Sequence, residues 1–156
     1  YLERKYDHVS MERVCSGLGL PNLYDFLRDS GHAVEPPALA QQLAAAQDRT
    51  PIIVEQALRD GDAATLCTAT LTLFEDILAA EASNMALKVL ATGGVYVGGG
   101  MPVRILGHLS PERFMQVFRH KGRFADMLGR MPVHVITRQA ALMGVADYGL
   151  QRMAVS

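Results

Sequence analysis

The feature that most limits what this chain can fold into is a long stretch without glycine or proline, from Asp62 to about Ala91. Its apolar residues recur with helical spacing, which predicts the longest helix of the chain. The expected stripe consists of Leu66, Leu73, Ile77, Leu87 and Val89, with Asn84 among them. The stretch leads into TGGVYVGGG, where residues 95–97 form a β-branched and aromatic run between glycines. This pattern is typical of a short buried strand.

Strand character is scarce elsewhere, since only PVHVIT at 132–137 offers a second convincing strand. Two strands do not make a stable sheet alone. The fold is therefore either essentially helical, or its strands belong to a larger sheet whose other members lie N-terminal to Tyr1. Capping residues, helix stops and apolar spacing predict further helices over 10–15, 21–31, 36–47, 50–61, 102–109, 110–120 and 138–153.

Composition is that of one globular domain or part of one, because 156 residues with 49% hydrophobic and 20% charged side chains can bury a core. A net charge of -1 provides no general electrostatic attraction to nucleic acid or an anionic membrane. No apolar run approaches the roughly 20 residues of a membrane helix. Cys15 and Cys67 lie in apolar, helical sequence and are expected to be reduced, which fits a cytoplasmic protein. The start at Tyr1, inside a charged segment, suggests a piece of a longer protein.

Two glycine-rich segments are candidate ligand sites. Gly98, Gly99 and Gly100 directly follow the first strand, where a ligand could approach backbone N–H groups at a helix start. A tight strand-to-helix turn explains them equally well. The second segment, Ser16-Gly17-Leu18-Gly19, separates two predicted helices, and the local pattern alone favours a helix C-cap there.

Among the charged residues, Glu12 is the most informative. It stands in the first turn after Ser10, where a carboxylate gains about 0.3–1 kcal/mol from the helix dipole, and this local gain alone can explain it. Glu81 and Asn84 share one helix face and predict a structural hydrogen bond. The five histidines show no spacing typical of metal ligands, so no metal site is predicted.

Taken in order, several segments of the chain resemble the C-terminal half of a bacterial glucokinase. The similarity covers nearly the whole sequence and rests on HVSMERVCSGLGLPNLY, SNMALKVLATGGVYVGGGMPVRIL, KGRF at 121–124, MPVHVI and AALMGVA. The resemblance implies an α/β fold of the hexokinase-like (ribonuclease H-like, actin-like ATPase) class. This chain would be the C-terminal part of its large domain, mainly helical with about two strands. Residues 1–137 would belong to the large domain, and 138–156 would form a helix that packs on the small domain.

The resemblance also implies roles for single residues in a transfer of phosphate from ATP to glucose. Glu12 matches the glutamate of the family's HVSxERV motif, a ligand of sugar hydroxyls. Gly98, Gly99 and Gly100 would lie by the nucleotide, and Ser16 and Gly17 would line the same cleft. The cofactors would be ATP and Mg²⁺, held mainly by the part of the family that this sequence lacks.

Several motifs of the family are absent from this sequence: the Asp-x-Gly-Gly-Thr phosphate loop, the Asn-Asp pair with the catalytic aspartate, the GTGLG loop and the Glu-Gly-Gly-His sugar motif. No catalytic residue is therefore expected in this chain, and the chain alone is expected to be inactive. Two alternatives stay open: a kinase of another hexose, and a non-catalytic helical or sugar-sensing module. In the last helix, Leu142, Met143, Val145 and Leu150 could form an exposed apolar patch that promotes a homodimer.

Overall fold

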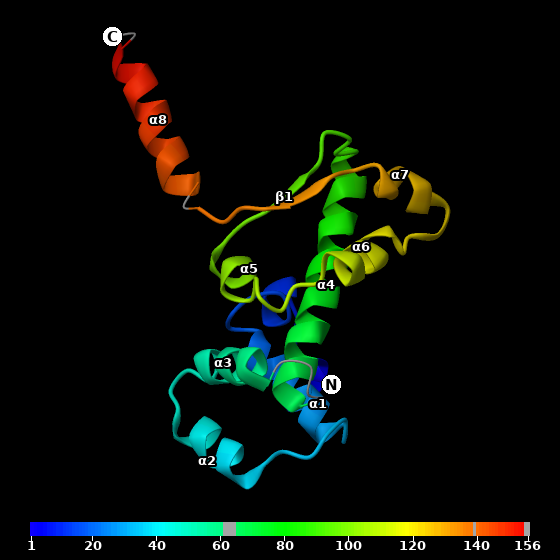
Figure 1. The fold of residues 1–156 in the computed structure, drawn as a ribbon, viewed down its shortest axis with the longest axis vertical. Helices are drawn as coiled ribbons and strands as arrows, with labels where there is room; N and C mark the ends of the chain where they lie inside the picture. Colours follow the sequence, from blue (N-terminus) through cyan, green and yellow to red (C-terminus); the bar gives the residue numbers. More distant parts are fainter. Residues whose placement is uncertain (61–64, 139, 155–156) are drawn as a thin grey trace.

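The computed structural model describes residues 1–60, 65–138 and 140–154, and one long helix, α4 (Leu66–Val89), organises it (Figure 1). The helix begins after Thr65, whose hydroxyl accepts a hydrogen bond from the Thr68 N–H at 3.2 Å. It ends at Val89, and the C-cap residue Leu90 takes a left-handed conformation with φ 49°. The prediction of the longest helix is confirmed, although positions 62–64 of the predicted range lie outside the described residues.

One core cluster packs on the N-terminal half of α4. Helices α1 (Leu20–Asp29) and α3 (Thr50–Asp60) both contact α4, and α2 (Pro37–Ala45) adds two leucines to the same cluster. Tyr24, Ile53, Leu66, Leu71 and Phe74 are the largest fully buried side chains of this cluster, together with Leu20 and Ile105. The predicted helices at 21–31, 36–47 and 50–61 are thus present, with ends shifted by a few residues.

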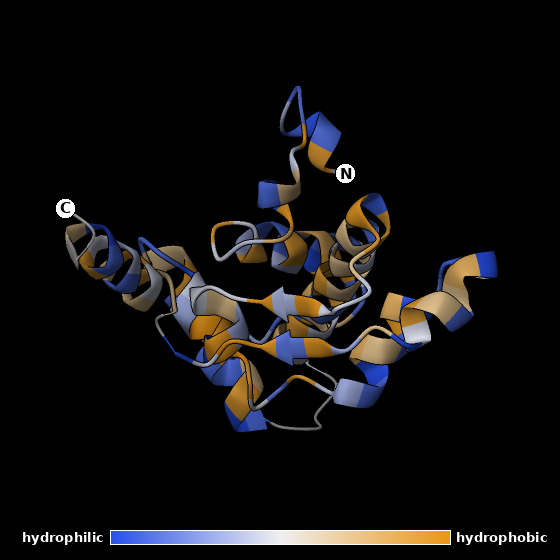
Figure 2. Cartoon of the chain, turned by 90° about the horizontal axis from the view of Figure 1, so that it is seen from above, coloured by the Kyte–Doolittle hydropathy of each residue, from blue (hydrophilic) through white to orange (hydrophobic). Residues whose placement is uncertain are grey.

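A second core cluster packs on the C-terminal half of α4, against α6 (Pro111–Arg119), α7 (Ala125–Gly129) and strand β1 (Val95–Val97). Strand β2 (Val133–Val135) pairs with β1 in parallel, with Val95 opposite Val133 and Val97 opposite Val135. Figure 2 shows the two strands side by side. Both predicted strands are present, but the prediction that the first is buried is wrong in part, because only Val97 is buried and Tyr96 is 67% exposed.

Short elements complete the fold. Helix α5 (Gly100–Arg104) follows β1, whereas the sequence predicted a helix over 102–109. Three single turns of 3-10 helix cover Leu2–Arg4, Met11–Arg13 and Gly122–Phe124. The predicted α-helix at 10–15 is wrong, because only the turn Met11–Arg13 forms there and Ser10 makes no side-chain capping bond.

The predicted apolar stripe of α4 is also partly wrong. Val89 is 75% exposed and Asn84 is exposed, while Leu73, Ile77 and Leu87 are only half-buried. The buried face instead carries Thr70, Glu75 and Ser83 beside apolar residues. Polar side chains can take core positions when their hydrogen bonds are satisfied, and these three have partners.

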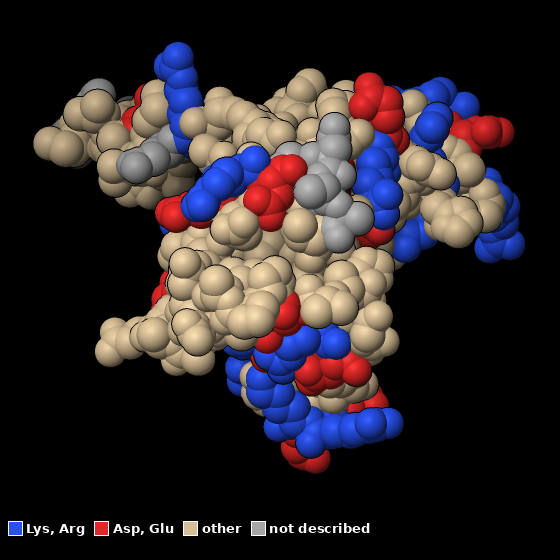
Figure 3. Space-filling model, turned by 60° about the horizontal axis from the view of Figure 1, so that its bottom comes forward, with Lys and Arg blue, Asp and Glu red and all other residues tan. Residues whose placement is uncertain are grey.

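The last helix, α8 (Ala140–Ala154), stands away from the rest of the chain (Figure 1). Leu142, Met143, Val145 and Leu150 are all more than 60% exposed, as the sequence suggested. In the part of the chain that the structure describes, no helix combines the length and apolarity needed to cross a membrane. On the face shown in Figure 3, basic and acidic side chains lie next to one another in each charged region.

Candidate functional site

Glu12 lies on the exposed 3-10 turn Met11–Arg13. Within residues 1–60, 65–138 and 140–154, no side chain forms an ion pair or hydrogen bond with its carboxylate. Because this element is a single turn, the expected gain from an α-helix dipole does not explain the residue. The carboxylate is free to accept hydrogen bonds from a ligand.

The backbone beneath Glu12 is fixed by the turn that follows it. The Ser16 hydroxyl donates to the Glu12 carbonyl at 2.6 Å and accepts from the Gly19 N–H at 3.0 Å. A Cβ atom on Gly19 would lie 2.7 Å from the Arg13 carbonyl group and 2.8 Å from the Glu12 carbonyl oxygen. Only glycine fits there, so the segment between Glu12 and Gly19 is a closed, tightly packed loop rather than a plain helix C-cap.

Two other elements contact the same loop. At the start of α3, the Thr50 hydroxyl donates to the Gly17 carbonyl at 2.8 Å. From α5, the Met101 sulfur lies 3.4 Å from the position of a Cβ on Gly17. Since Met101 directly follows Gly98–Gly100, the structure brings the Glu12 loop close to the second glycine segment.

The second glycine segment comprises the turn after β1 and the first residue of α5. Gly98, Gly99 and Gly100 are exposed, and Gly99 has φ 109°, a conformation that favours glycine. The turn lines a cavity of about 730 Å³, together with Val103, Ile136, Thr137, Arg138 and residues 140–142. Among the described lining residues, Arg138 carries the only charge, and its sign suits an anionic ligand.

Ser16 and Gly17 are not among the described residues that line this cavity. The Ser16 hydroxyl is already engaged on both sides, and the Gly17 carbonyl is bonded to Thr50. Sequence reasoning predicted a helix over 50–61 but did not identify the contact of Thr50 with Gly17. Thr50 and Gly17 are 33 positions apart in the sequence, so no local pattern reveals this contact.

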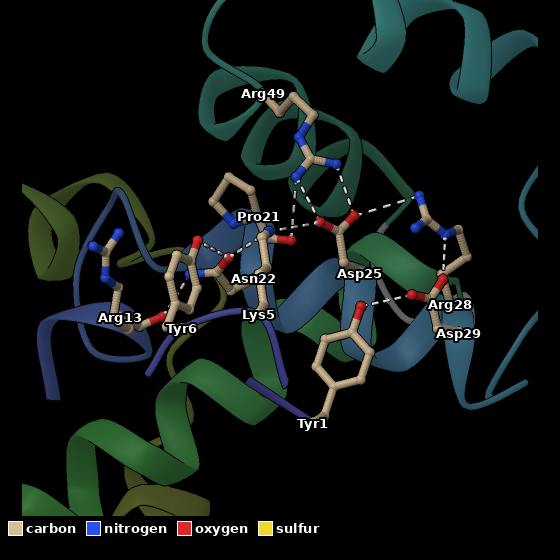
Figure 4. A network of polar contacts seen from close by, with 10 residues as sticks. All are labelled: Tyr1, Lys5, Tyr6, Arg13, Pro21, Asn22, Asp25, Arg28, Asp29 and Arg49. Carbon is tan, nitrogen blue, oxygen red and sulfur yellow. Dashed lines mark hydrogen bonds and ion pairs between the residues drawn. The ribbon is translucent and has the colours of Figure 1, made fainter. Parts of the chain in front are cut away.

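A polar network ties the N-terminal segment to α1 and to Arg49, the residue before α3 (Figure 4). The buried Asp25 accepts two hydrogen bonds from the Arg49 guanidinium, both at 2.8 Å, and also lies 3.4 Å from Arg28. The partner carboxylate raises the pKa of Arg49, although burial of the guanidinium opposes it. Next to this pair, Asn22 donates to the Arg13 carbonyl at 3.0 Å and accepts from Lys5 at 3.2 Å. Through Asn22, the network therefore helps to fix the backbone of the turn that carries Glu12.

At the edge of this network, the Tyr1 hydroxyl donates to Asp29 at 2.6 Å. That hydrogen bond raises the pKa of Tyr1 to about 12 and lowers the pKa of Asp29. This contact holds the first residues against α1. It involves exposed groups and has no role in the candidate site.

The polar residues of α4 are structural. Glu75 is 1% exposed and accepts from the Ser110 N–H at 3.0 Å, and burial raises the pKa of its carboxyl. Asp76 holds Arg113 through two bonds of 2.8 and 2.7 Å. These contacts fix α6 on α4, away from the Glu12 loop.

The predicted bond between Glu81 and Asn84 is confirmed at 3.0 Å, and Lys121 donates to Asn84 at 2.7 Å. The KGRF segment is thereby held on α4. Cys15 and Cys67 are both free thiols, as expected, and burial raises the pKa of Cys67 to about 12. The described residues contain no group of three potential metal ligands.

Comparisons with known proteins agree on one family. The family model described as Glucokinase matches residues 1–152. A glucokinase of Trichormus variabilis is 39% identical over 94% of this chain and 46% of its own length, and one of Photorhabdus laumondii is 35% identical over 99% and 44%. The chain thus spans just under half the length of the curated relatives it matches.

A solved structure gives the same answer for the fold. The crystal structure of a glucokinase from an Antarctic psychrotroph matches with a TM-score of 0.70 and 29% identity, over 88% of this chain and 39% of that one. Its likeness agrees with the expected C-terminal part of a hexokinase-like fold, mainly helical with a two-stranded parallel sheet. Sequence and fold lead to one conclusion: the chain belongs to the glucokinase family.

Proposed function

We propose that this chain is the part of an ATP-dependent glucokinase that supplies Glu12 to the sugar site and the Gly98–Gly100 turn to the nucleotide site. The observation that carries the proposal is the unpaired Glu12 carboxylate, held by a loop that also contacts Met101, the residue after the three glycines. Family membership supplies the reaction, the transfer of the ATP γ-phosphoryl to glucose.

In this scheme Glu12 accepts hydrogen bonds from sugar hydroxyls. Its two oxygens can serve two neighbouring hydroxyls, and bonds to a charged acceptor are worth about 1.5–3 kcal/mol each. The rigid backbone beneath Glu12 keeps the carboxylate in place before the sugar arrives, so less binding energy is lost in ordering it.

The nucleotide would lie in the cavity beside Gly98–Gly100. The exposed glycine backbone allows close approach of phosphate oxygens, and Arg138 adds a positive charge to the cavity lining. Ser16 and Gly17 would contribute to the cleft by shaping the loop next to Met101. Mg²⁺ would neutralise charge on the phosphates during transfer, and we expect its ligands in the part of the family that lies outside this chain.

The catalytic groups and the other sugar ligands would come from the same missing part. We further propose that residues 1–137 form the end of the large domain, and that 138–156 pack on the small domain. We also propose a cytoplasmic location, a role in glycolysis, a homodimer, and no partner among nucleic acids or membranes.

The test uses the full-length protein with ATP, Mg²⁺ and glucose, and follows ADP release. We expect activity in the wild type, and a glucose KM about 10- to 100-fold higher in Glu12→Gln, because the neutral amide loses the charge-assisted bonds. The ATP KM should change little. An unchanged glucose KM in this variant would refute the role of Glu12.

Two alternatives have distinct outcomes in the same assay. Mannose or fructose used better than glucose would point to a kinase of another hexose, since a carboxylate that binds hydroxyls does not by itself select an epimer. Failure to release ADP with any of the three sugars would favour a non-catalytic module.

A further inference from the structure

The Thr50 hydroxyl lies at one end of a chain of contacts that leads to Glu12. It donates to the Gly17 carbonyl at 2.8 Å, and the neighbouring Ser16 hydroxyl donates to the Glu12 carbonyl at 2.6 Å. Gly17 and Ser16 are adjacent in the sequence, so a shift of one moves the other. The contact therefore connects the start of α3 to the backbone of Glu12.

The Thr50 bond has no close substitute. The side chain is only 3% exposed, so water cannot readily replace its hydroxyl. The other donor to the Gly17 carbonyl is the Leu20 N–H, at a long 3.4 Å. Thr50 itself is fixed, because its N–H donates to Asp48 at 2.9 Å.

The rest of the loop is packed so closely that a displacement of Gly17 also displaces Glu12. Gly19 packs directly on the backbone of Glu12 and Arg13, with no room for even a methyl group. Asn22 holds the Arg13 carbonyl at 3.0 Å. A loop closed this tightly moves as a unit, since close-packed groups have no space for local relaxation.

We infer that Thr50 is a positioning residue for the sugar site, acting through Gly17 and Ser16 on the Glu12 carboxylate. The inference rests on the proposed role of Glu12. Thr50 does not touch the sugar; its hydroxyl keeps the Glu12 loop in the geometry that binds it.

The experiment compares Thr50→Val, which keeps the shape and removes the hydroxyl, with Thr50→Ser, which keeps the hydroxyl. Thr70→Val is the matched control, because Thr70 is also fully buried, but among the described residues its hydroxyl bonds only to Leu66 within α4. The full-length protein is assayed with ATP and glucose, well below the unfolding midpoint of each variant.

We expect Thr50→Val to raise the glucose KM about 3- to 10-fold, the effect of one lost hydrogen bond, with the ATP KM unchanged. Thr50→Ser should restore a KM near the wild-type value, and Thr70→Val should leave it unchanged. A glucose KM in Thr50→Val equal to that of Thr70→Val, or an equal rise in both substrate KM values, would overturn the inference.

Ser16→Ala gives an independent measurement should Thr50→Val fail to fold. It removes the bond to the Glu12 carbonyl and should also raise the glucose KM. An unchanged glucose KM in Ser16→Ala would overturn the inference by itself. Failure of the proposed function looks different: no glucose phosphorylation by the wild type, or no effect of Glu12→Gln, would reject the sugar site and the inference together.

Discussion

Gly19→Ala tests whether the Glu12 loop is as tightly closed as its contacts indicate. The added Cβ would lie 2.7 Å from the Arg13 carbonyl carbon, whereas two carbon atoms sit comfortably at about 3.5–4.0 Å. The loop must therefore open by about 0.8 Å or more. The cost is steric alone, because Gly19 has φ −80°, which alanine adopts without strain.

Overpacking of this kind costs about 1–3 kcal/mol of unfolding free energy. For a chain of this size, that lowers the unfolding midpoint by about 3–10 °C, measured by circular dichroism. The same opening moves Glu12, so the glucose KM of the full-length protein should rise as well.

Gly93→Ala is the control, because a Cβ there meets nothing within 4 Å and Gly93 has no positive φ. The substitution should be neutral or raise the midpoint slightly, since alanine restricts the unfolded chain. If Gly19→Ala unfolds at the same temperature as Gly93→Ala, the loop is looser than its contacts imply and the argument for a preformed Glu12 site fails.

Three further predictions concern Glu75, the isolated chain and α8. Burial raises the pKa of Glu75, so the folded state holds its proton more tightly and this group's contribution to stability falls as pH rises from about 4.3 through the raised pKa. Glu75→Gln keeps an acceptor for the Ser110 N–H, and thermal unfolding should show the loss of that pH dependence; parallel pH curves for both proteins would contradict it. The 156-residue chain alone should release no ADP in response to glucose, and measurable release would overturn the expectation that catalysis needs groups outside it. The exposed apolar residues of α8 should cause self-association in sedimentation, which Leu142→Glu with Leu150→Glu should reduce; a strict monomer at high concentration would count against it.

Elements with strong local signals were predictable from the sequence. Helix α6 begins at Pro111 after Ser110, whose hydroxyl accepts the Arg113 N–H as a cap should. The strand at Val95–Val97 followed from its β-branched and aromatic residues between glycines. In these segments local propensity, with a capping residue in the case of α6, is enough to fix the type of element.

Elements decided by distant partners were not predictable. The buried face of α4 includes Glu75, because a backbone N–H of residue 110 satisfies it, and no periodicity within α4 reveals that partner. After Ser10 only a single turn forms, and the side chains of Ser16 and Asn22 donate to the carbonyls of Glu12 and Arg13. Local propensity alone favoured a helix there, but contacts with residues outside the segment determine its structure.

The candidate site shows the same division. Local reasoning could treat Glu12 as a helix-start acid and the glycines as turns, and the family resemblance was needed to connect them. What neither revealed is how near the two segments lie: a Cβ built on Gly17 would be 3.4 Å from the Met101 sulfur. These residues are 84 positions apart in the sequence, and their approach depends on how α5 packs.

The path of the chain after β1 favours glycine at two of the three positions that follow the strand. Val97, the last strand residue, belongs to the core cluster on the C-terminal half of α4, whereas Met101 packs on the cluster at the N-terminal half. The chain must pass from one core to the other within Gly98–Gly100, and Gly99 does so with φ 109°. At Gly98 a side chain would have to fit beside Ile136, which lies 3.3 Å from a Cβ built there, whereas a Cβ on Gly99 or Gly100 meets nothing within 4 Å. The turn that links the two cores therefore leaves backbone exposed at the proposed nucleotide site. The next residue, Met101, lies beside the loop that carries Glu12, the proposed sugar ligand.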